Sequence, residues 1–444
     1  MMTNKNELKI HFVGVGGVSM SALCKYCLSY GFSVSGSDRI YSERLKELEN
    51  LGAIIKVGHS EENVDGVHVV VYSDAISQDN PEIKKAKAQG VYILSRAELL
   101  KMITENFDAV VGVAGCHGKT TVTSMLAHIF IKANVPFTAH IGGDDSVYGN
   151  FIKKGSQVFL SEVCEFKKNV DRFTADFAVC LNTGKDHMDC YKDEEELKLT
   201  YLSFVKRAYR SIIGINDDIL NEYKGKNAVG FSLYNDSKYT AKNIKEVRGL
   251  SSFDLFVNSK KKGRIKLSVG GEYNVKNALA AIACASEMSI PLPKIKLGLK
   301  SFKGVKRRYE RIGSLNGVLV IADYAHHPTE ITACLERAKE EFKGKIHVVF
   351  QPHTYSRTIF LKDEFIFALS GISNLYLYKT YSARETYILG GGAKDLSESL
   401  SNSKYFEDIQ ELLISLKQKT DKNDVILVLG AGDLYDIFKS EINR

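Results

Sequence analysis

Short apolar runs alternate along the chain with stretches of helical length. The run at 8–15 predicts a buried strand, and the stretch at 19–30 predicts the helix that follows it. The same order returns further on, with strands expected at 32–36, 67–72 and 91–94 and helices expected at 42–50 and 82–88. Because strands that alternate with helices form parallel sheets covered on both faces, the pattern predicts an α/β fold.

The alternating pattern starts afresh at two later points. A second series begins with the strand expected at 107–114 and its helix at 120–133, and a third begins with the strand expected at 317–322. Further strands are expected at 157–160, 178–181, 346–351, 375–378 and 425–429, and a hydrophilic stretch at 235–254 precedes a helix at 274–288. Three starts in 444 residues predict three α/β domains, at 1–106, 107–308 and 309–444.

Charge and composition exclude several classes of protein. Lys and Arg number 60 against 53 Asp and Glu, and the basic runs, such as Lys260–Lys262, are short. A nucleic-acid binder clusters its basic residues, so we expect no nucleic-acid partner. No apolar run reaches the roughly 18–20 residues of a membrane helix, and the first residues lack the apolar core of a secretory signal. We therefore expect a cytoplasmic protein without membrane insertion, and the scattered cysteines agree with a reducing compartment.

A first glycine-rich loop follows the strand at 8–15. Backbone N–H groups at the start of a helix bind phosphate groups, and Asp38 ends the next strand at a spacing close to that of a dinucleotide fingerprint. Ser19 replaces the third glycine, so the signal is weak: it indicates a diphosphate-containing nucleotide without saying which, and a simple tight turn is the alternative. The candidate residues are Gly14, Gly16, Gly17, Val18, Ser19 and Asp38.

A second loop, between the strand at 107–114 and the helix at 120–133, has the core of a P-loop. Val113 stands where the strict motif has its first glycine, but Gly118-Lys119-Thr120 is intact. A lysine here reaches the β- and γ-phosphates of a nucleotide, and a threonine hydroxyl binds Mg²⁺. The acidic partner that such a metal needs is expected in the segment 161–165, which contains Glu162 and Glu165, or in the segment 182–189, where His187 offers a nitrogen.

Polar clusters also follow two strands of the third series. The segment 323–328 contains His326, and 351–358 contains His353 and Arg357. Because parallel strands place sites at their carboxyl ends, these side chains are expected to form one site. A guanidinium binds a carboxylate through two hydrogen bonds, so Arg357 indicates a carboxylate ligand.

Six motifs occur in an order that resembles the Mur ligase family. They are G-x-H-G-K-T-T at 115–121, D-H-M-D at 186–189, N-x-x-N-A-L-A-A at 274–281, K-R-R-Y-E at 306–310, D-Y-A-H-H-P-T-E at 323–330 and Q-P-H-x-Y-S-R-T at 351–358. The resemblance implies an α/β fold of three domains: an N-terminal Rossmann-like domain for UDP-N-acetylmuramate, a central P-loop domain for ATP, and a C-terminal Rossmann-like domain for the amino acid. It further implies ATP- and Mg²⁺-dependent ligation of L-alanine through an acyl phosphate, in the synthesis of peptidoglycan precursors.

The resemblance also implies a role for each matching residue. Lys119, His326 and Arg357 would be catalytic. ATP would contact Gly115, Cys116, His117, Gly118, Lys119, Thr120, Thr121, Asn277, Arg307 and Arg308. The metal would bind Thr120, Glu162 and His187, the amino acid would contact Tyr324, His326, His353 and Arg357, and Ser73 would join the residues of the first loop around the UDP substrate.

The chain departs from the family pattern at several positions, and two other functions stay open. Val163-Cys164 and Phe166-Lys167 stand where many members have Ala-Asp and Ser-Asp, Tyr273 stands where many have His, and Thr354 stands where many have Arg. The change at Thr354 leaves the choice of amino acid undecided. One alternative is a related ligase with another amino acid or a muramyl-peptide acceptor. The other is a non-catalytic or dehydrogenase-like nucleotide binder that uses the first loop alone, but it leaves the motif at 115–121 unexplained.

Overall fold

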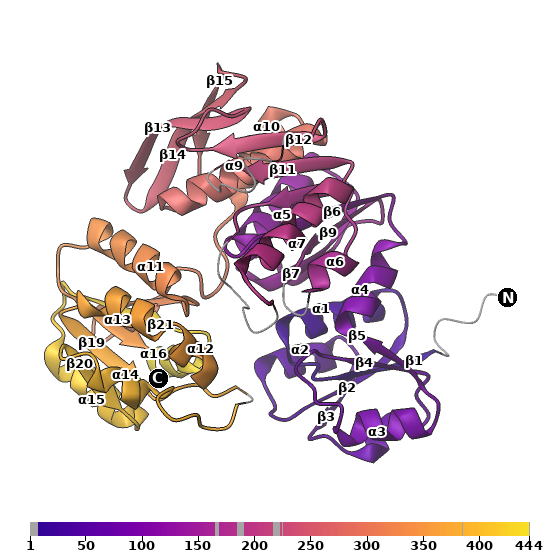
Figure 1. The fold of residues 1–444 in the computed structure, drawn as a ribbon, viewed down its shortest axis with the longest axis horizontal. Helices are drawn as coiled ribbons and strands as arrows, with labels where there is room; N and C mark the ends of the chain where they lie inside the picture. The colour runs from indigo at the N-terminus through magenta and orange to yellow at the C-terminus, as the bar shows by residue number, and fades with distance from the viewer. Residues whose placement is uncertain are drawn as a thin grey trace. The chain divides into compact units, whose positions relative to one another are not determined.

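The structure is a computed structural model that describes residues 8–164, 168–183, 191–215, 223, 225–383 and 385–443. The chain divides into two compact units, Met1–Gly304 and Val305–Arg444, the second of which is orange to yellow in Figure 1. His187, predicted as a metal ligand, lies outside the described residues.

The first unit begins with a five-stranded parallel sheet of strand order β3-β2-β1-β4-β5. Its elements are β1 (Lys9–Val13), α1 (Val18–Ser29), β2 (Ser33–Asp38), α2 (Glu43–Asn50), β3 (Ile54–Val57), η2 (Glu61–Val64), β4 (Val69–Tyr72), α3 (Pro81–Ala88), β5 (Tyr92–Ser95) and α4 (Arg96–Thr104). The direction in which the chain crosses the sheet reverses between β1 and β4. Ligands of open α/β sheets bind at such a switch point, and the first glycine loop follows β1 there while Ser73 follows β4.

A ten-stranded mixed sheet of order β15-β14-β13-β12-β11-β10-β6-β9-β7-β8 completes the first unit. Its strands are β6 (Ala109–Ala114), β7 (Phe137–Asp145), β8 (Gly149–Lys153), β9 (Val158–Glu162), β10 (Phe177–Cys180), β11 (Arg210–Gly214), β12 (Ala228–Ser232), β13 (Tyr239–Val247), β14 (Leu250–Val257) and β15 (Lys260–Lys266). Its helices are α5 (Lys119–Ala133), α6 (Asn169–Arg172), α7 (Glu194–Arg207), α9 (Glu272–Glu287) and α10 (Leu292–Ser301). The helix α5 packs against α9 and α10, so the helix that follows the P-loop is buried.

The antiparallel strands β13–β15 cover the hydrophilic stretch and extend beyond it to Lys266. Tyr239 and Ala241 are buried while Lys242 and Lys245 are exposed, so polar residues interrupt the apolar ones along β13. A strand with one solvated face shows no continuous apolar run, and this is why the apolar runs predicted no strand there. The expectation of parallel sheets is confirmed for β1–β5 and is wrong for this extension and for β8, which is antiparallel to β7.

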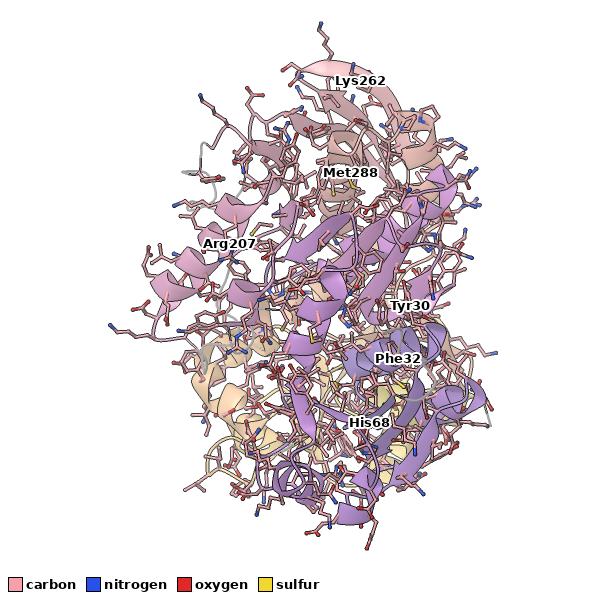
Figure 2. The ribbon with its side chains drawn as sticks, turned by 90° about the vertical axis from the view of Figure 1, so that its right-hand side faces the viewer. Tyr30, Phe32, His68, Arg207, Lys262 and Met288 are labelled. Atoms are coloured by element: carbon pink, nitrogen blue, oxygen red, sulfur yellow. The ribbon has the colours of Figure 1, made fainter. Side chains whose placement is uncertain are left out.

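At the outer edge of this sheet lies β15, which begins with Lys260, Lys261 and Lys262, all exposed. Figure 2 labels Lys262 on this strand, at the top of the view. Charged side chains on an edge strand disfavour pairing with another strand.

The second unit has a six-stranded sheet of order β16-β17-β21-β18-β19-β20, parallel except for β16. Its strands are β16 (Glu310–Leu315), β17 (Val318–Asp323), β18 (Ile346–Phe350), β19 (Asn374–Tyr378), β20 (Ser403–Phe406) and β21 (Val425–Leu429). Its helices are α11 (Pro328–Glu341), α12 (Tyr355–Phe360), α13 (Lys362–Ser370), α14 (Ala393–Glu398), α15 (Ile409–Lys419) and α16 (Leu434–Ile442). Among the described helices, none has the length and apolarity that crossing a membrane requires.

Within the first unit, α1 packs on β7 and β8 and joins the two sheets through buried polar contacts. Lys25 Nζ donates to Asn150 Oδ1 at 2.8 Å, and Asn150 Nδ2 donates to the Val18 carbonyl at 2.8 Å. Arg44 pairs with Asp144 at 2.9 Å. Buried polar groups that satisfy one another hold a single geometry, so the two glycine-rich loops of this unit have a defined relative position.

Candidate functional site

The P-loop lies between β6 and the N-terminus of α5. Gly118 has a positive φ of 90°, and a Cβ there would lie 2.5 Å from Asn277 Oδ1 on α9. Only glycine meets both demands at once. The structure thus places Asn277 against the loop, and it places Lys119 and Thr120 in the first turn of α5, where N–H groups and the helix dipole favour phosphate.

Internal hydrogen bonds hold the P-loop in shape. Asn182, just after β10, accepts from the His117 N–H and donates to the His117 carbonyl, both at 3.0 Å. Lys119 Nζ donates to the carbonyls of Gly115 and Cys116 at 2.6 and 3.2 Å. Asn182 begins the segment 182–189 that was expected to hold a metal ligand, but its hydrogen bonds to the P-loop backbone were not predicted.

The predicted metal ligands Thr120 and Glu162 lie together. Thr120 Oγ1 donates to Glu162 Oε2 at 3.1 Å, and the Gly142 N–H donates to Glu162 Oε1 at 2.6 Å. Glu162 is the last residue of β9, and β9 pairs with β6, the strand that leads into the P-loop. Among the described residues, no group of three or more His, Cys, Asp or Glu side chains could hold a metal. A hydroxyl and a carboxylate are hard oxygen donors, the type that Mg²⁺ prefers.

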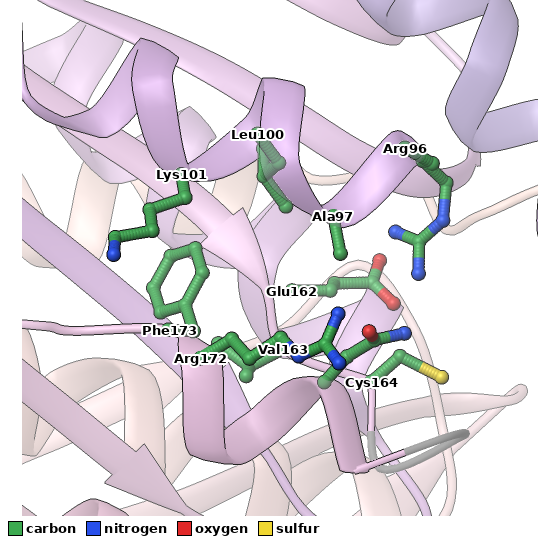
Figure 3. A pocket seen from close by; sticks show the side chains of 10 residues that line it. Arg96, Ala97, Leu100, Lys101, Glu162, Val163, Cys164, Arg172 and Phe173 are labelled. Atoms are coloured by element: carbon green, nitrogen blue, oxygen red, sulfur yellow. The ribbon is translucent and has the colours of Figure 1, made fainter. Parts of the chain in front are cut away.

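A pocket beside Glu162 is lined from α4, the end of β9 and α6 (Figure 3). Arg96, Lys101 and Arg172 bring three cations to it, and Figure 3 shows the Arg96 guanidinium and the Glu162 carboxylate at the same end. The side chain of Asn169, 8% exposed, also lines it, and its Nδ2 has no hydrogen-bond partner among the described residues. Arg96 pairs with Asp74 at 3.2 Å and the Glu162 carboxylate shares the lining, so part of this positive charge is compensated. None of these cations was predicted, because single basic residues on helices carry no pattern.

Several backbone N–H groups of the first glycine loop donate hydrogen bonds within the protein. The N–H groups of Gly14 and Val15 donate to the Ser37 carbonyl at 2.9 and 3.0 Å. Asp38 Oδ2 accepts from the Gly16 N–H at 2.8 Å, so the Asp38 carboxylate orders the loop. The Ser73 N–H donates to the Val13 carbonyl at 3.2 Å, which brings Ser73 to the loop as expected. The expectation that these residues contact a nucleotide stays a prediction.

In the second unit, the predicted amino-acid residues form one cluster. The ring of His326 lies 5.2 Å from that of Tyr324 and 5.8 Å from that of His353, measured between centroids. Arg357 Nη1 donates to His353 Nδ1 at 3.2 Å. The structure therefore brings together all four side chains from the ends of β17 and β18.

Two further residues shape this cluster. The Tyr381 ring stacks on His353 with centroids 5.7 Å apart, and no sequence pattern singled it out. Thr354 has a positive φ of 69°, which is unfavourable for a β-branched residue, and its N–H donates to the Tyr381 carbonyl at 3.0 Å. The departure from the family pattern at position 354 thus coincides with a strained backbone.

The two arginines predicted for ATP differ in their surroundings. Arg307 Nη2 donates to the carbonyls of Gly430 and Gly432 at 3.1 and 2.7 Å, and its guanidinium lies over the Tyr324 ring. Arg308 is half-exposed and lies 3.6 Å from Glu330. Both arginines therefore make contacts within their own unit, and the expectation that they contact ATP stays a prediction.

Asp323, at the end of β17, is a buried carboxyl group beside this cluster whose pKa is raised. Burial raises the pKa of its carboxyl to about 6, against the lowering effect of Arg308 and of the N–H groups of Ala325 and Tyr309. Those two N–H groups donate to it at 2.7 Å each. Asp323 thus orders the backbone on both sides of the site.

Comparisons with known proteins match the whole length of the chain to one family. Family models match at residues 9–108 (Mur ligase family, catalytic domain), 113–285 (Mur ligase middle domain) and 307–432 (Mur ligase, glutamate ligase domain). The UDP-N-acetylmuramate–L-alanine ligase of Clostridium acetobutylicum is 41% identical, covering 98% of this chain and 97% of its own. That of Lachnospira eligens is 39% identical, covering 97% of both chains.

Solved structures give the same result. The UDP-N-acetylmuramate-alanine ligase of Thermotoga maritima superposes with a TM-score of 0.84 at 29% identity, covering 98% of this chain and 97% of that one. A murein peptide ligase from Psychrobacter arcticus has a TM-score of 0.77 at 22% identity, which shows a shared fold. With three family models in order along the chain and relatives at about 40% identity over its whole length, the chain belongs to the Mur ligase family.

Proposed function

We propose that this chain joins L-alanine to the lactyl carboxylate of UDP-N-acetylmuramate with hydrolysis of ATP, a step in peptidoglycan precursor synthesis. The observation that carries the proposal is the identity of 41% and 39% over nearly the whole chain with two enzymes named for that reaction. We assign the UDP substrate to 1–106, ATP to 107–308 and the amino acid to 309–444.

The P-loop would bind the ATP phosphates. The N-terminus of α5 directs N–H groups and its dipole at them, and Lys119 exchanges its two carbonyl acceptors for phosphate oxygens. The γ-phosphoryl group passes to the lactyl carboxylate, giving an acyl phosphate and ADP. Lys119 offsets the charge that develops on the transferring group.

Mg²⁺ fits the pair of oxygen donors that Thr120 and Glu162 provide, and these two residues would hold it. When bound, the ion would neutralise phosphate charge. Glu162 is kept in place for this by the Gly142 N–H.

The second unit would supply the amino acid. Arg357 would bind the alanine carboxylate, and its contact with His353 holds the guanidinium in place. His326 Nδ1 donates to the Tyr324 carbonyl at 2.9 Å, so in the neutral ring Nε2 carries no hydrogen and can accept one. His326 would take a proton from the alanine ammonium, whose nitrogen then attacks the acyl carbon as phosphate leaves.

The experiment that tests this function is a phosphate-release assay with UDP-N-acetylmuramate, ATP and a panel of amino acids. We expect release only with the acceptor and L-alanine both present. Preference for another amino acid or a muramyl-peptide acceptor would replace this function with that of a related ligase. NAD(P) binding without ATP hydrolysis would favour the non-catalytic nucleotide binder.

Lys119→Ala is expected to lower kcat at least about 100-fold, because it removes a cation that contacts the transferring phosphoryl group. Calorimetry is expected to show unchanged binding of UDP-N-acetylmuramate, whose assigned site lies on the other sheet. Lys132→Ala, an exposed position in the last turn of the same helix, is the matched control and should keep normal turnover. Turnover of Lys119→Ala within about tenfold of the unsubstituted enzyme would reject the P-loop assignment.

A further inference from the structure

A chain of hydrogen bonds runs from the first glycine loop to Glu162 through one buried histidine. Ser19 Oγ lies 2.8 Å from His140 Nε2, and His140 Nδ1 lies 3.0 Å from Ser161 Oγ. Ser161 Oγ in turn donates to the Glu162 carbonyl at 2.9 Å. His140 is 4% exposed and Ser161 is fully buried, so water does not compete for the bond between these two side chains.

The proton positions along this chain follow from its chemistry. A carbonyl oxygen only accepts, so the Ser161 hydroxyl hydrogen points to Glu162 and Ser161 Oγ accepts from His140 Nδ1–H. Burial, together with nearby Arg96, lowers the pKa of His140 to about 4, so the ring is neutral and Nε2 accepts. The Ser19 hydroxyl therefore donates its hydrogen to His140, and its oxygen faces Arg96 Nη1 at 3.5 Å.

Both ends of this chain lie at candidate binding groups. Ser19 is in the first turn of α1, after the first glycine loop. Glu162 is held a second time by the strand that carries His140, since Gly142 on β7 donates to its carboxylate. A displacement of His140 would therefore act on the glycine loop and on Glu162 together.

We propose that His140 is a positioning residue, which keeps the first glycine loop and Glu162 in a fixed register. Given the proposed function, this register aligns the acceptor held at the first loop with the phosphates and metal held at Thr120 and Glu162. Acceptor binding and metal–nucleotide binding then both depend on the same hydrogen-bond chain, although the first glycine loop follows a strand of the first sheet and Glu162 lies on a strand of the second.

The chain also contains a buried histidine that serves as a comparison. His128, 1% exposed, joins Ser301 at 2.9 Å and Asp145 at 3.1 Å, and neither partner is a residue of a glycine loop or is hydrogen-bonded to Glu162. Loss of a purely structural histidine lowers the melting temperature and leaves the ligand affinity of the folded protein unchanged. His128→Leu is therefore the matched control for His140→Leu.

The test uses calorimetry with two probes on the full chain: UDP-N-acetylmuramate alone, and ADP with Mg²⁺ alone. We expect His140→Leu to weaken both affinities about fivefold or more, and Ser19→Ala to weaken them as well. The double variant should lose no more than His140→Leu alone, because both substitutions break one chain. His128→Leu should melt at a lower temperature and bind both probes normally.

His140→Asn separates the two halves of the chain. The asparagine amide can take the place of Nδ1 and donate to Ser161, but nothing replaces Nε2 as the acceptor for Ser19. We expect this variant to bind Mg²⁺·ADP better than His140→Leu does, while its binding of UDP-N-acetylmuramate stays weak.

Normal affinity for Mg²⁺·ADP in both His140→Leu and Ser19→Ala, within about twofold, would overturn the proposal, as would equal losses in His128→Leu. If His140→Leu fails to fold, Ser19→Ala, at a half-buried position, decides the question by itself. The Mg²⁺·ADP measurement does not depend on which acceptor the enzyme uses. Failure of the phosphate-release assay would thus reject the proposed function without deciding the role of His140.

Discussion

Among single residues, Glu82 on α3 is a buried carboxylate surrounded by polar side chains. It is fully buried, and its carboxylate contacts Ser37 at 2.8 Å, Asn63 at 2.6 Å, His59 at 2.8 Å and His11 at 3.5 Å. Burial alone would raise the pKa of Glu82, but these partners outweigh it and lower the pKa. The Ser37 carbonyl also accepts from the N–H groups of Gly14 and Val15, so the cluster around Glu82 is linked to the first glycine loop through Ser37.

Glu82→Gln is expected to reduce the free energy of unfolding by about 2–4 kcal/mol, because an amide cannot accept from all the donors that face the carboxylate. A carboxyl whose pKa is lower in the folded than in the unfolded state stabilises the fold above its unfolded pKa. This contribution is lost as the pH falls through the folded pKa. The difference between the two proteins should therefore be full at neutral pH and shrink in acid.

Urea unfolding at a series of pH values measures this effect. Glu43→Gln is the control, since that side chain is 92% exposed and should leave stability unchanged. An equal difference at pH 7 and at pH 3 would show that the charge of Glu82 does not stabilise the fold.

At the scale of elements, the close crossing of α5 and α10 depends on one glycine. A Cβ on Gly298 would lie 2.7 Å from the Ile129 backbone nitrogen, and a backbone atom cannot turn aside as a side chain can. The position of α5, and with it the first turn that carries Lys119, therefore depends on a small residue at 298.

Gly298→Ala is expected to destabilise the first unit by about 1–3 kcal/mol through overpacking, and to weaken ATP binding as α5 shifts. Thermal unfolding and nucleotide titration measure the two effects. Gly371→Ala is the matched control, because nothing lies within 4 Å of the Cβ it would gain. Normal stability and nucleotide affinity in Gly298→Ala would mean that the two helices separate without consequence.

Most of the buried strands could be predicted from the sequence. Apolar runs predicted β1, β4, β6 and β21 because those strands are buried on both faces, and the ends of such strands carry most candidate site residues. Contacts made between distant segments could not be predicted. The bond between Asp38 and Gly16, the clamp of Asn182 on His117 and the stacking of Tyr381 on His353 each depend on tertiary geometry that no local pattern encodes.

For the whole molecule, the apolar cores follow the two compact units. One cluster includes Phe12 on β1 of the first sheet and Phe204 on α7, which packs against β10 and β11 of the second sheet, so the first unit shares a core across both of its sheets. The clusters around Leu427 and Phe438 contain residues of the second unit alone. Each unit therefore has the means to unfold cooperatively by itself.

Calorimetry is expected to resolve two unfolding transitions. Glu82→Gln should lower the transition of the first unit alone. Leu427→Ala truncates a fully buried side chain. It should reduce the free energy of unfolding of the second unit by about 2–5 kcal/mol and lower the temperature of that transition alone. A single transition lowered by both substitutions would contradict independent unfolding.

The lysines of β15 have a consequence for concentrated solutions of this protein. The strand leaves one row of backbone groups unpaired at the end of the ten-stranded sheet, and in two copies these rows are complementary. Lys260, Lys261 and Lys262 make the approach of two such edges repulsive at low ionic strength. The repulsion is screened over about 3 Å at 1 M salt. Colloidal stability at this edge is thus electrostatic in origin and declines as salt is added.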